Sequence, residues 1–400
     1  MTATRIVRGA TLAAATALWV FLAVLLWRTT VPAHLGLPHL DERAAFGSAL
    51  TDKARRFERF LDWEWVVATV AALVAYVVML GRGRGLAPRL GLGSVNAGIV
   101  LGLVTLTVVW AVELPFGIAA NWWQRRHGIS REGYVTELAG AWGRLLAVTA
   151  IAFVALALVL SLARRFGRSW WIAAGPALAA LVLGFELVVP YLDSVGTKPV
   201  RSPELRAEIR SLERREHAGR PPVRVENVTG TTTAANAFAV GVGPSERVFL
   251  WNTLLDRRFT HDQVRFVLGH ELAHLVRNHV LRGVAWFALL VLPVLAVVAL
   301  LADLRHARAV PLALLVVAVA ELVLLPLQNA IARRYETEAD WIGLNATRDP
   351  AAAHGLFVGF VRTSFLDPSP PGWVHVLLDD HPTPLQRVEL ARAWRERNRR

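Results

Sequence analysis

Seven long apolar segments constrain the fold of this 400-residue chain more than any other feature. Each segment is close to the length that an α-helix needs to cross the hydrocarbon core of a bilayer. Hydrophobic residues make up 54% of the chain, which is too much for an ordinary soluble protein. The sequence therefore predicts a mainly α-helical polytopic membrane protein, with spans near Ala10–Trp27, Trp65–Leu80, Ala97–Ile118, Leu145–Leu162, Trp170–Tyr191, Val284–Leu301 and Val310–Leu327.

The residues His270-Glu271-Leu272-Ala273-His274 form an HExxH pattern between the fifth and sixth apolar segments. Two histidines four residues apart lie on one face of a helix, so both imidazoles can reach one tetrahedral zinc ion. Glu271 is then left beside the metal, where it can take a proton from a water whose pKa the ion lowers. Thr260 is a suitable N-cap for this helix, followed by Gln263 in the first turn. The pattern predicts a zinc hydrolase.

A third metal ligand is expected from a second helix just after the last apolar segment, where Ala332–Asp340 offers three acidic residues. Glu336 and Asp340 are four residues apart and share one face of that helix. Glu336 can therefore bind the ion, while Asp340 accepts a hydrogen bond from a ligand imidazole and fixes its tautomer. Glu338 is expected to point elsewhere and to be solvated. An ordinary charged helix end is the alternative, and it would leave the histidine pair without a third ligand.

The polar region between the fifth and sixth spans is expected to form a small α+β domain. Apolar residues at helical spacing predict a helix over Pro203–His217. Alternating residues predict a short strand at Val223–Val228, and two short runs on either side of a glycine-rich turn predict strands at Asn236–Val240 and Arg247–Trp251. The whole chain then divides into a membrane region (1–192), a zinc-peptidase core (193–282), two further spans (283–327) and a segment with the third ligand and a substrate-binding part (328–400).

A protease needs an exposed strand edge that holds its substrate extended through backbone hydrogen bonds. The strand that starts at Asn236 could be that edge. A structural hairpin that covers the metal helix, with its turn at Gly241–Glu246, is the alternative interpretation of the same residues.

The net charge of +13 comes mostly from arginines that are scattered through the polar segments. This distribution argues against nucleic-acid binding and favours attraction to the headgroups of the lipid bilayer. Cysteine is absent, so a metal must be held by nitrogen and oxygen. Arg5 and Arg8 before the first span would suit a signal peptide, but the apolar run is long and no small-residue cleavage site follows it, which favours an uncleaved anchor. Basic residues near the membrane beside the HExxH segment favour a cytoplasmic active site.

Several motifs follow one another along the chain: Asn236-Ala237-Phe238, Arg247-Val248-Phe249-Leu250, His270-Glu271-Leu272-Ala273-His274 with His279, Glu336 with Ala339-Asp340, and His381-Pro382 with Arg387. In the order and spacing of these motifs, the chain resembles the integral-membrane zinc endopeptidases of the CaaX prenyl protease 1 family. The resemblance extends upstream to Leu114-Pro115-Phe116 and so covers most of the chain. Departures at Ala273, Ala332 and Thr383 concern substrate preference and leave the zinc chemistry unchanged.

The resemblance implies about seven transmembrane helices around a water-filled chamber, with the zinc domain closing one end on the cytoplasmic side. Carried over by position, His270, His274 and Glu336 would bind one Zn²⁺ per chain. Glu271 would act as general base and acid, and Asp340 would orient a ligand from behind. His279 is expected to have a supporting or structural role.

The resemblance also implies a substrate site. Asn236, Ala237 and Phe238 would bind the peptide strand, while His381 and Arg387 would stabilise the oxyanion and anchor the peptide. For His381, a helix cap beside a proline is the alternative interpretation.

The expected function is zinc-dependent hydrolysis of peptide bonds in a peptide or protein substrate, whether lipidated or membrane-associated. The arginine bias suggests a GC-rich bacterial gene, for which prenylated substrates are not expected. Processing or quality control of membrane proteins in a bacterial plasma membrane is therefore the alternative to prenyl-protein cleavage. A non-catalytic seven-helix protein is a further alternative, although structural zinc sites usually have four protein ligands and three candidates are found here.

Overall fold

The computed structural model describes the backbone of residues 2–399 and the side chains of residues 13–399. Among these residues, five helical segments are long and apolar enough to cross a membrane. One of the five spans 60 residues, Tyr134–Asp193, and contains two helices that pack against each other, α5 (Tyr134–Phe166) and α6 (Trp170–Asp193). Helix α1 (Thr2–Leu26) adds a shorter apolar stretch, Ala13–Leu26. The predicted helical membrane protein is confirmed, and the count of seven spans stays a prediction.

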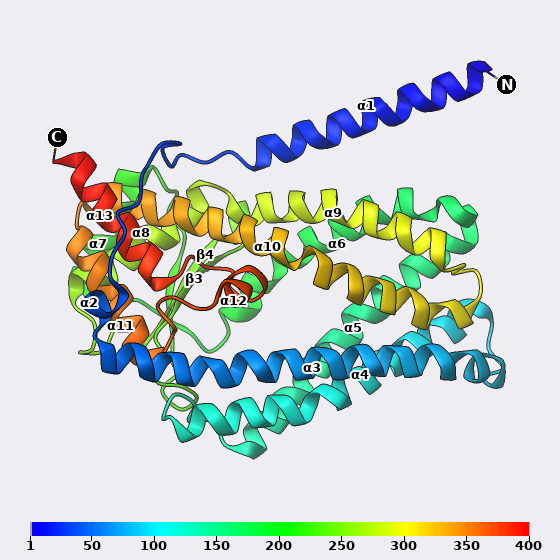
Figure 1. Ribbon diagram of the computed structural model, residues 1–400, viewed down its shortest axis with the longest axis horizontal. Helices are drawn as coiled ribbons and strands as arrows, with labels where there is room; N and C mark the ends of the chain where they lie inside the picture. The colour runs from blue at the N-terminus through cyan, green and yellow to red at the C-terminus, as the bar shows by residue number, and fades with distance from the viewer. Residues whose placement is uncertain (1, 400) are drawn as a thin grey trace.

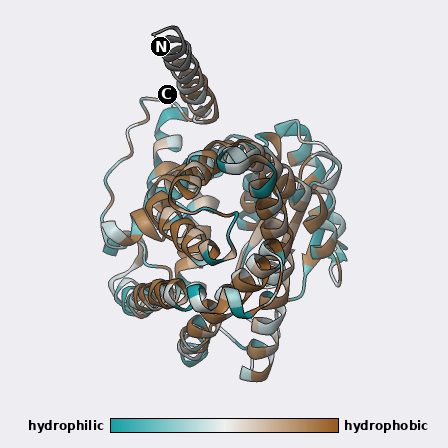
Figure 2. Ribbon diagram, turned by 90° about the vertical axis from the view of Figure 1, so that its right-hand side faces the viewer, coloured by the Kyte–Doolittle hydropathy of each residue, from teal (hydrophilic) through white to brown (hydrophobic). Residues whose placement is uncertain are grey.

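Six long helices form a closed ring whose axis runs along the molecule (Figures 1 and 2). Each helix packs against the next in the order α3–α4–α5–α6–α9–α10, and α10 returns to α3. A cavity of about 560 Å³ lies between α3, α4, α5 and α10 and is lined by side chains such as Trp65, Glu113, Arg144 and Leu322. The bounds of the other ring helices are α3 (Ser48–Arg89), α4 (Ser94–Arg126), α9 (His279–Leu301) and α10 (Val310–Thr347).

Small residues allow the ring helices to approach closely. A Cβ atom added to Gly98 of α4 would lie 2.9 Å from Leu160 of α5. A Cβ atom added to Gly102 of α4 would lie 2.6 Å from Leu156 of α5. Close approach of this kind is typical of helix packing in membranes, where no hydrophobic force drives helices together. Helix α1 follows the outside of the ring and diverges from it toward the N-terminus (Figure 1). Its end near Leu26 stays attached, since Trp19 Nε1 donates a hydrogen bond 3.0 Å long to Leu289 O on α9.

The polar end of the molecule contains a four-stranded sheet in the order β1-β2-β4-β3. The three predicted strands are present as β2 (Val223–Glu226), β3 (Ala237–Val240) and β4 (Arg247–Trp251), while β1 (Lys198–Pro199) was not predicted. Strands β3 and β4 form the predicted hairpin, and β2 pairs with β4 in parallel. Strand β3 lies at the edge of the sheet, so its outer side has no strand partner among the described residues.

Five helices complete the polar end and build its core. They are α7 (Pro203–Glu216), α8 (His261–Val276), α11 (Pro350–Ser364), α12 (Gly372–Leu377) and α13 (Pro384–Asn398), and the short α2 (Glu42–Phe46) lies nearby. Leu268 and Leu272 of α8 are fully buried in this core beside Leu250 of β4 and Phe357 of α11. Burial of these leucines fixes the rotation of α8 and thereby directs its histidine face toward α10.

Candidate metal centre

Helix α8 starts at the predicted N-cap. The Thr260 side chain accepts a hydrogen bond from the backbone N–H of Gln263, and the Gln263 side chain accepts one from the backbone N–H of Thr260. This reciprocal arrangement satisfies two N–H groups that a helix start otherwise leaves unpaired. It fixes the helix that carries His270, Glu271 and His274.

The second helix of the site is the continuation of α10. The apolar part of α10 runs on without a break past the predicted span into the polar end, so Glu336 and Asp340 stand on the same 38-residue helix. Helices α8 and α10 pack closely against each other. The two ligand-bearing faces therefore meet over the centre of the polar end.

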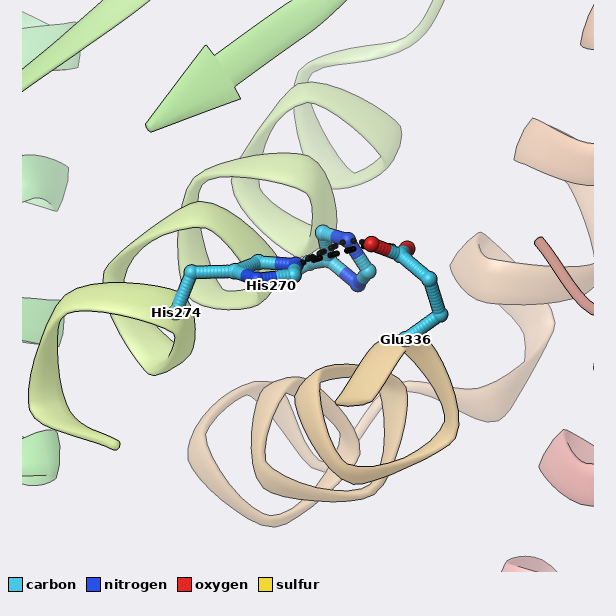
Figure 3. Close-up of side chains that lie close together, drawn as sticks. All are labelled: His270, His274 and Glu336. Atoms are coloured by element: carbon cyan, nitrogen blue, oxygen red, sulfur yellow. Dashed lines mark hydrogen bonds and ion pairs between the residues drawn. The ribbon is translucent and has the colours of Figure 1, made fainter. Parts of the chain in front are cut away.

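The structure brings the three predicted ligands together (Figure 3). His270 Nε2 lies 3.1 Å from His274 Nε2 and 3.2 Å from Glu336 Oε2. The other carboxylate oxygen of Glu336, Oε1, lies 3.3 Å from His274 Nε2. Bonds of about 2.0–2.1 Å to a tetrahedral zinc ion would place neighbouring ligand atoms roughly 3.3 Å apart. The three side chains form a group that could hold a metal ion.

The donor set fits zinc, because two imidazole nitrogens and one carboxylate oxygen are ligands that this ion accepts. Glu336 Oε2 is buried and has no hydrogen-bond partner among the described residues, although His270 Nε2 and His381 Nε2 each lie 3.2 Å away. A buried carboxylate oxygen without a donor is costly unless a cation is bound to it. The three ligands leave one side of the site open to a cavity of about 310 Å³.

Asp340 lies behind the first ligand. Its Oδ1 is 2.9 Å from His270 Nδ1, and its carboxylate is almost fully buried. Arg387 donates two hydrogen bonds to the same carboxylate, with Nη2 2.6 Å from Oδ1 and Nε 2.7 Å from Oδ2. The sequence suggested that Arg387 anchors the peptide. In the structure the guanidinium of Arg387 also binds Asp340, and the side chain lines the cavity.

The prediction that Glu338 is solvated is wrong. Its side chain is 0% exposed and accepts hydrogen bonds from Arg277, His279, Arg282 and the backbone N–H of Thr30. Helical spacing placed Glu338 away from the metal correctly, but that face of α10 is covered by α9 and by the chain after α1. The basic residues that follow the HExxH segment were the sequence signal for this buried acid.

Glu271 faces the cavity next to the ligands. The side chain is 6% exposed, and burial is the main reason that its pKa rises to about 7. The negative charge of Glu336 also raises this pKa, whereas His270 opposes the rise. A carboxyl group with a pKa near neutrality can both accept and return a proton at ordinary pH.

His381 lies at the rim of the site, about half exposed, with Nε2 3.2 Å from Glu336 Oε2. Its other ring nitrogen, Nδ1, lies 2.7 Å from Asp380 Oδ1. His381 does not cap the following helix, because α13 has Thr383 as its N-cap, in a reciprocal pair with Gln386. The helix-cap alternative for His381 is therefore excluded.

The predicted substrate residues divide into two sets. Asn236 and Ala237 line the cavity beside His270 and Glu271. Phe238 does not line it, because its ring stacks on Phe249 of β4 at a centroid distance of 5.0 Å. Successive residues of a strand point to opposite faces, which places Phe238 away from Ala237.

Several carboxylates at the cavity were missed by the sequence analysis: Glu58, Asp367, Asp379 and Asp380. Asp379 and Asp380 precede His381 directly, and this proximity was an available signal. Glu58 comes from α3, which is more than 200 residues away along the chain from the HExxH segment, and no local pattern marks it.

Comparisons with known proteins agree with this fold. Residues 199–395 match peptidase family M48. An uncharacterized metalloprotease of Bacillus subtilis, YhfN, is 28% identical over 251 residues, and the match spans 58% of this chain and 58% of the relative. The crystal structure of Ste24p from S. mikatae superposes with a TM-score of 0.71 at 17% identity, covering 94% of this chain and 96% of that one. Residues 199–395 are therefore similar to peptidase family M48, and the chain shares a membrane fold with Ste24p.

Proposed function

We propose that this chain is a membrane-embedded zinc-dependent endopeptidase. The observation that supports this most strongly is the spacing of 3.1–3.3 Å among the ligand atoms of His270, His274 and Glu336 beside a cavity that also contains Glu271. A structural zinc site would instead be closed by four protein ligands. The open side of this site suits catalysis.

The reaction that fits these residues is peptide-bond hydrolysis. One zinc ion, held by His270, His274 and Glu336, would polarise a carbonyl oxygen and acidify a water molecule. Glu271 would take a proton from the attacking water and later deliver it to the leaving amine. His381 would donate a hydrogen bond to the oxygen that gains negative charge.

Strand β3 would hold the substrate. Its outer edge has no strand partner among the described residues, and Asn236 and Ala237 stand at the cavity. A peptide that adds to this edge forms backbone hydrogen bonds in register, which presents one amide to the site regardless of its side chains. In this proposal Phe238 stabilises the strand and does not touch the peptide.

The location of the site favours substrates that are membrane-associated or lipidated. The site lies on α8 and α10 at one end of the helix ring (Figure 1). A cavity of about 560 Å³ lies between four of the ring helices. The arginine-rich composition and the Bacillus subtilis relative support a bacterial plasma membrane. The basic residues near the membrane beside the HExxH segment support a zinc-bearing end in the cytoplasm. Processing or clearance of membrane proteins is the role that this placement favours over cleavage of prenylated proteins.

Peptide cleavage by the purified full-length chain tests the proposal. The parent should cleave unfolded protein substrates, lose activity with a chelator and regain it with zinc. Glu271→Gln should be inactive, because the amide cannot accept the proton. A Glu271→Gln variant that cleaves at the parental rate would contradict the assignment of the base, and activity that resists chelation would contradict the zinc mechanism.

A further inference from the structure

We propose that His279 and Glu338 are positioning residues for the second ligand, His274. This inference rests on the proposed zinc site. His274 Nδ1 lies 3.0 Å from His279 Nδ1, and His279 Nε2 lies 3.1 Å from Glu338 Oε2. Glu338 thus reaches the ligand through one intervening imidazole, at the start of α9.

The proton positions of this chain of contacts are consistent with zinc binding. The Nε2 atom of His274 faces His270 and Glu336, so the metal-binding lone pair is on Nε2 and the ring proton is on Nδ1. His274 Nδ1–H then donates to His279 Nδ1, which must be unprotonated. His279 in turn has its proton on Nε2 and donates to Glu338. One tautomer of each ring satisfies every contact.

Packing restricts the intervening ring. His279 stacks on Tyr335 with a centroid distance of 4.5 Å and an interplanar angle of 5°. Tyr335 is itself held by a hydrogen bond of 2.9 Å from Trp286 Nε1. His279 is buried, so it cannot exchange its partners for water. The ring therefore transmits the position of Glu338 to His274.

Glu338 is fixed from several elements at once. Arg277 follows α8, Arg282 lies on α9, and the backbone N–H of Thr30, which lies 2.6 Å from Oε1, follows α1. Arg282 also donates hydrogen bonds to the carbonyl oxygens of Leu26 and Arg28. Two arginines keep the buried carboxylate ionised and held in one orientation.

The three acidic residues near the end of α10 then have complementary roles. Glu336 is the ligand, Asp340 contacts His270 directly, and Glu338 reaches His274 through His279. Each ligand histidine has a carboxylate behind it, and both carboxylates come from the helix that supplies the third ligand. Partners of this kind orient a ligand ring and raise its basicity.

Zinc affinity of the full-length chain tests the inference. We compare the parent with Glu338→Gln, with His279→Phe, which keeps a ring against Tyr335 but removes both nitrogens, and with Glu321→Gln. The last is a matched control, because Glu321 is exposed on the same helix and bonds only Gln328 among the described residues. Affinity is measured by competition with a chelator, and site geometry by the visible spectrum of the Co²⁺-substituted protein.

Glu338→Gln and His279→Phe should each weaken zinc binding about 10–100-fold and change the Co²⁺ spectrum, whereas the control should match the parent. A purely structural role would lower thermal stability and leave both metal readouts at the parental values, which would overturn the inference. A parent that binds no zinc would instead contradict the proposed function itself. A zinc-bound structure of the unaltered chain gives a test without substitutions, since separation of the two Nδ1 atoms beyond hydrogen-bond distance would also overturn it.

Discussion

The guanidinium of Arg387 forms two hydrogen bonds to the carboxylate of Asp340, which itself contacts the ligand His270. Arg387 and Asp340 are both nearly buried, and they come from α13 and α10. The C-terminal helix is thereby tied to the metal centre through one ion pair.

Replacement of Arg387 by alanine should therefore damage the metal site as well as any peptide contact. The change leaves the Asp340 charge buried without its cation, a loss that typically costs about 3–5 kcal/mol. We expect a lower unfolding temperature and weaker zinc binding. Arg387→Lys is the control, since it keeps the charge with a single donor and should be affected less. Alanine and lysine variants that both raise KM alone, with parental zinc affinity, would limit Arg387 to substrate binding.

Glu216 at the end of α7 predicts a pH dependence of stability. Its two carboxyl oxygens are buried without hydrogen-bond partners, and burial raises its pKa from 4.5 to about 8. A folded-state pKa above the unfolded value gives stability that is complete below about pH 4.5 and is lost as pH rises toward about 8. The parent should thus lose more stability than Glu216→Gln between about pH 6 and pH 9.

Thermal unfolding of the two proteins at both pH values checks this expectation. Glu208→Gln serves as a control, because Glu208 lies on the same helix, is not buried and pairs with Arg265. Equal losses in the parent and Glu216→Gln would mean that Glu216 finds a partner in solution.

The chain after α1 should influence the metal centre, because the backbone N–H of Thr30 donates to Glu338. Thr30→Pro removes this N–H, whereas Thr30→Ala retains it. We expect weaker zinc binding for the proline variant alone, by up to the roughly 10-fold effect of losing a ligand-supporting contact. Chelator competition on both variants provides the measurement. Equal affinities would show that Glu338 is held sufficiently by its arginines.

Local periodicity explains what the sequence revealed. Four-residue spacing placed His270 and His274 on one face of α8, and it placed Glu336 and Asp340 on one face of α10. This prediction needed no knowledge of the tertiary structure. Strand β2 followed from two-residue alternation, and β3 and β4 followed from short runs on either side of a glycine-rich turn. The long apolar segments predicted the membrane helices because a bilayer sets their length.

Tertiary contacts determine the features that the sequence did not predict. Glu338 faces away from the metal, as its spacing requires, but α9 and the chain after α1 bury that face. Which side of a helix meets solvent depends on neighbours that its own sequence does not specify. The parallel pairing of β2 with β4 and the position of Glu58 at the cavity also depend on tertiary contacts, so the sequence did not predict them.

The central claim is that His270, His274 and Glu336 hold one zinc ion together. X-ray absorption at the zinc edge, combined with zinc content per chain, tests it on the purified full-length protein. The claim predicts about one zinc per chain with two imidazoles and one carboxylate at about 2.0–2.2 Å, and loss of that signal in Glu336→Gln. Zinc retained by Glu336→Gln with an unchanged spectrum would contradict it.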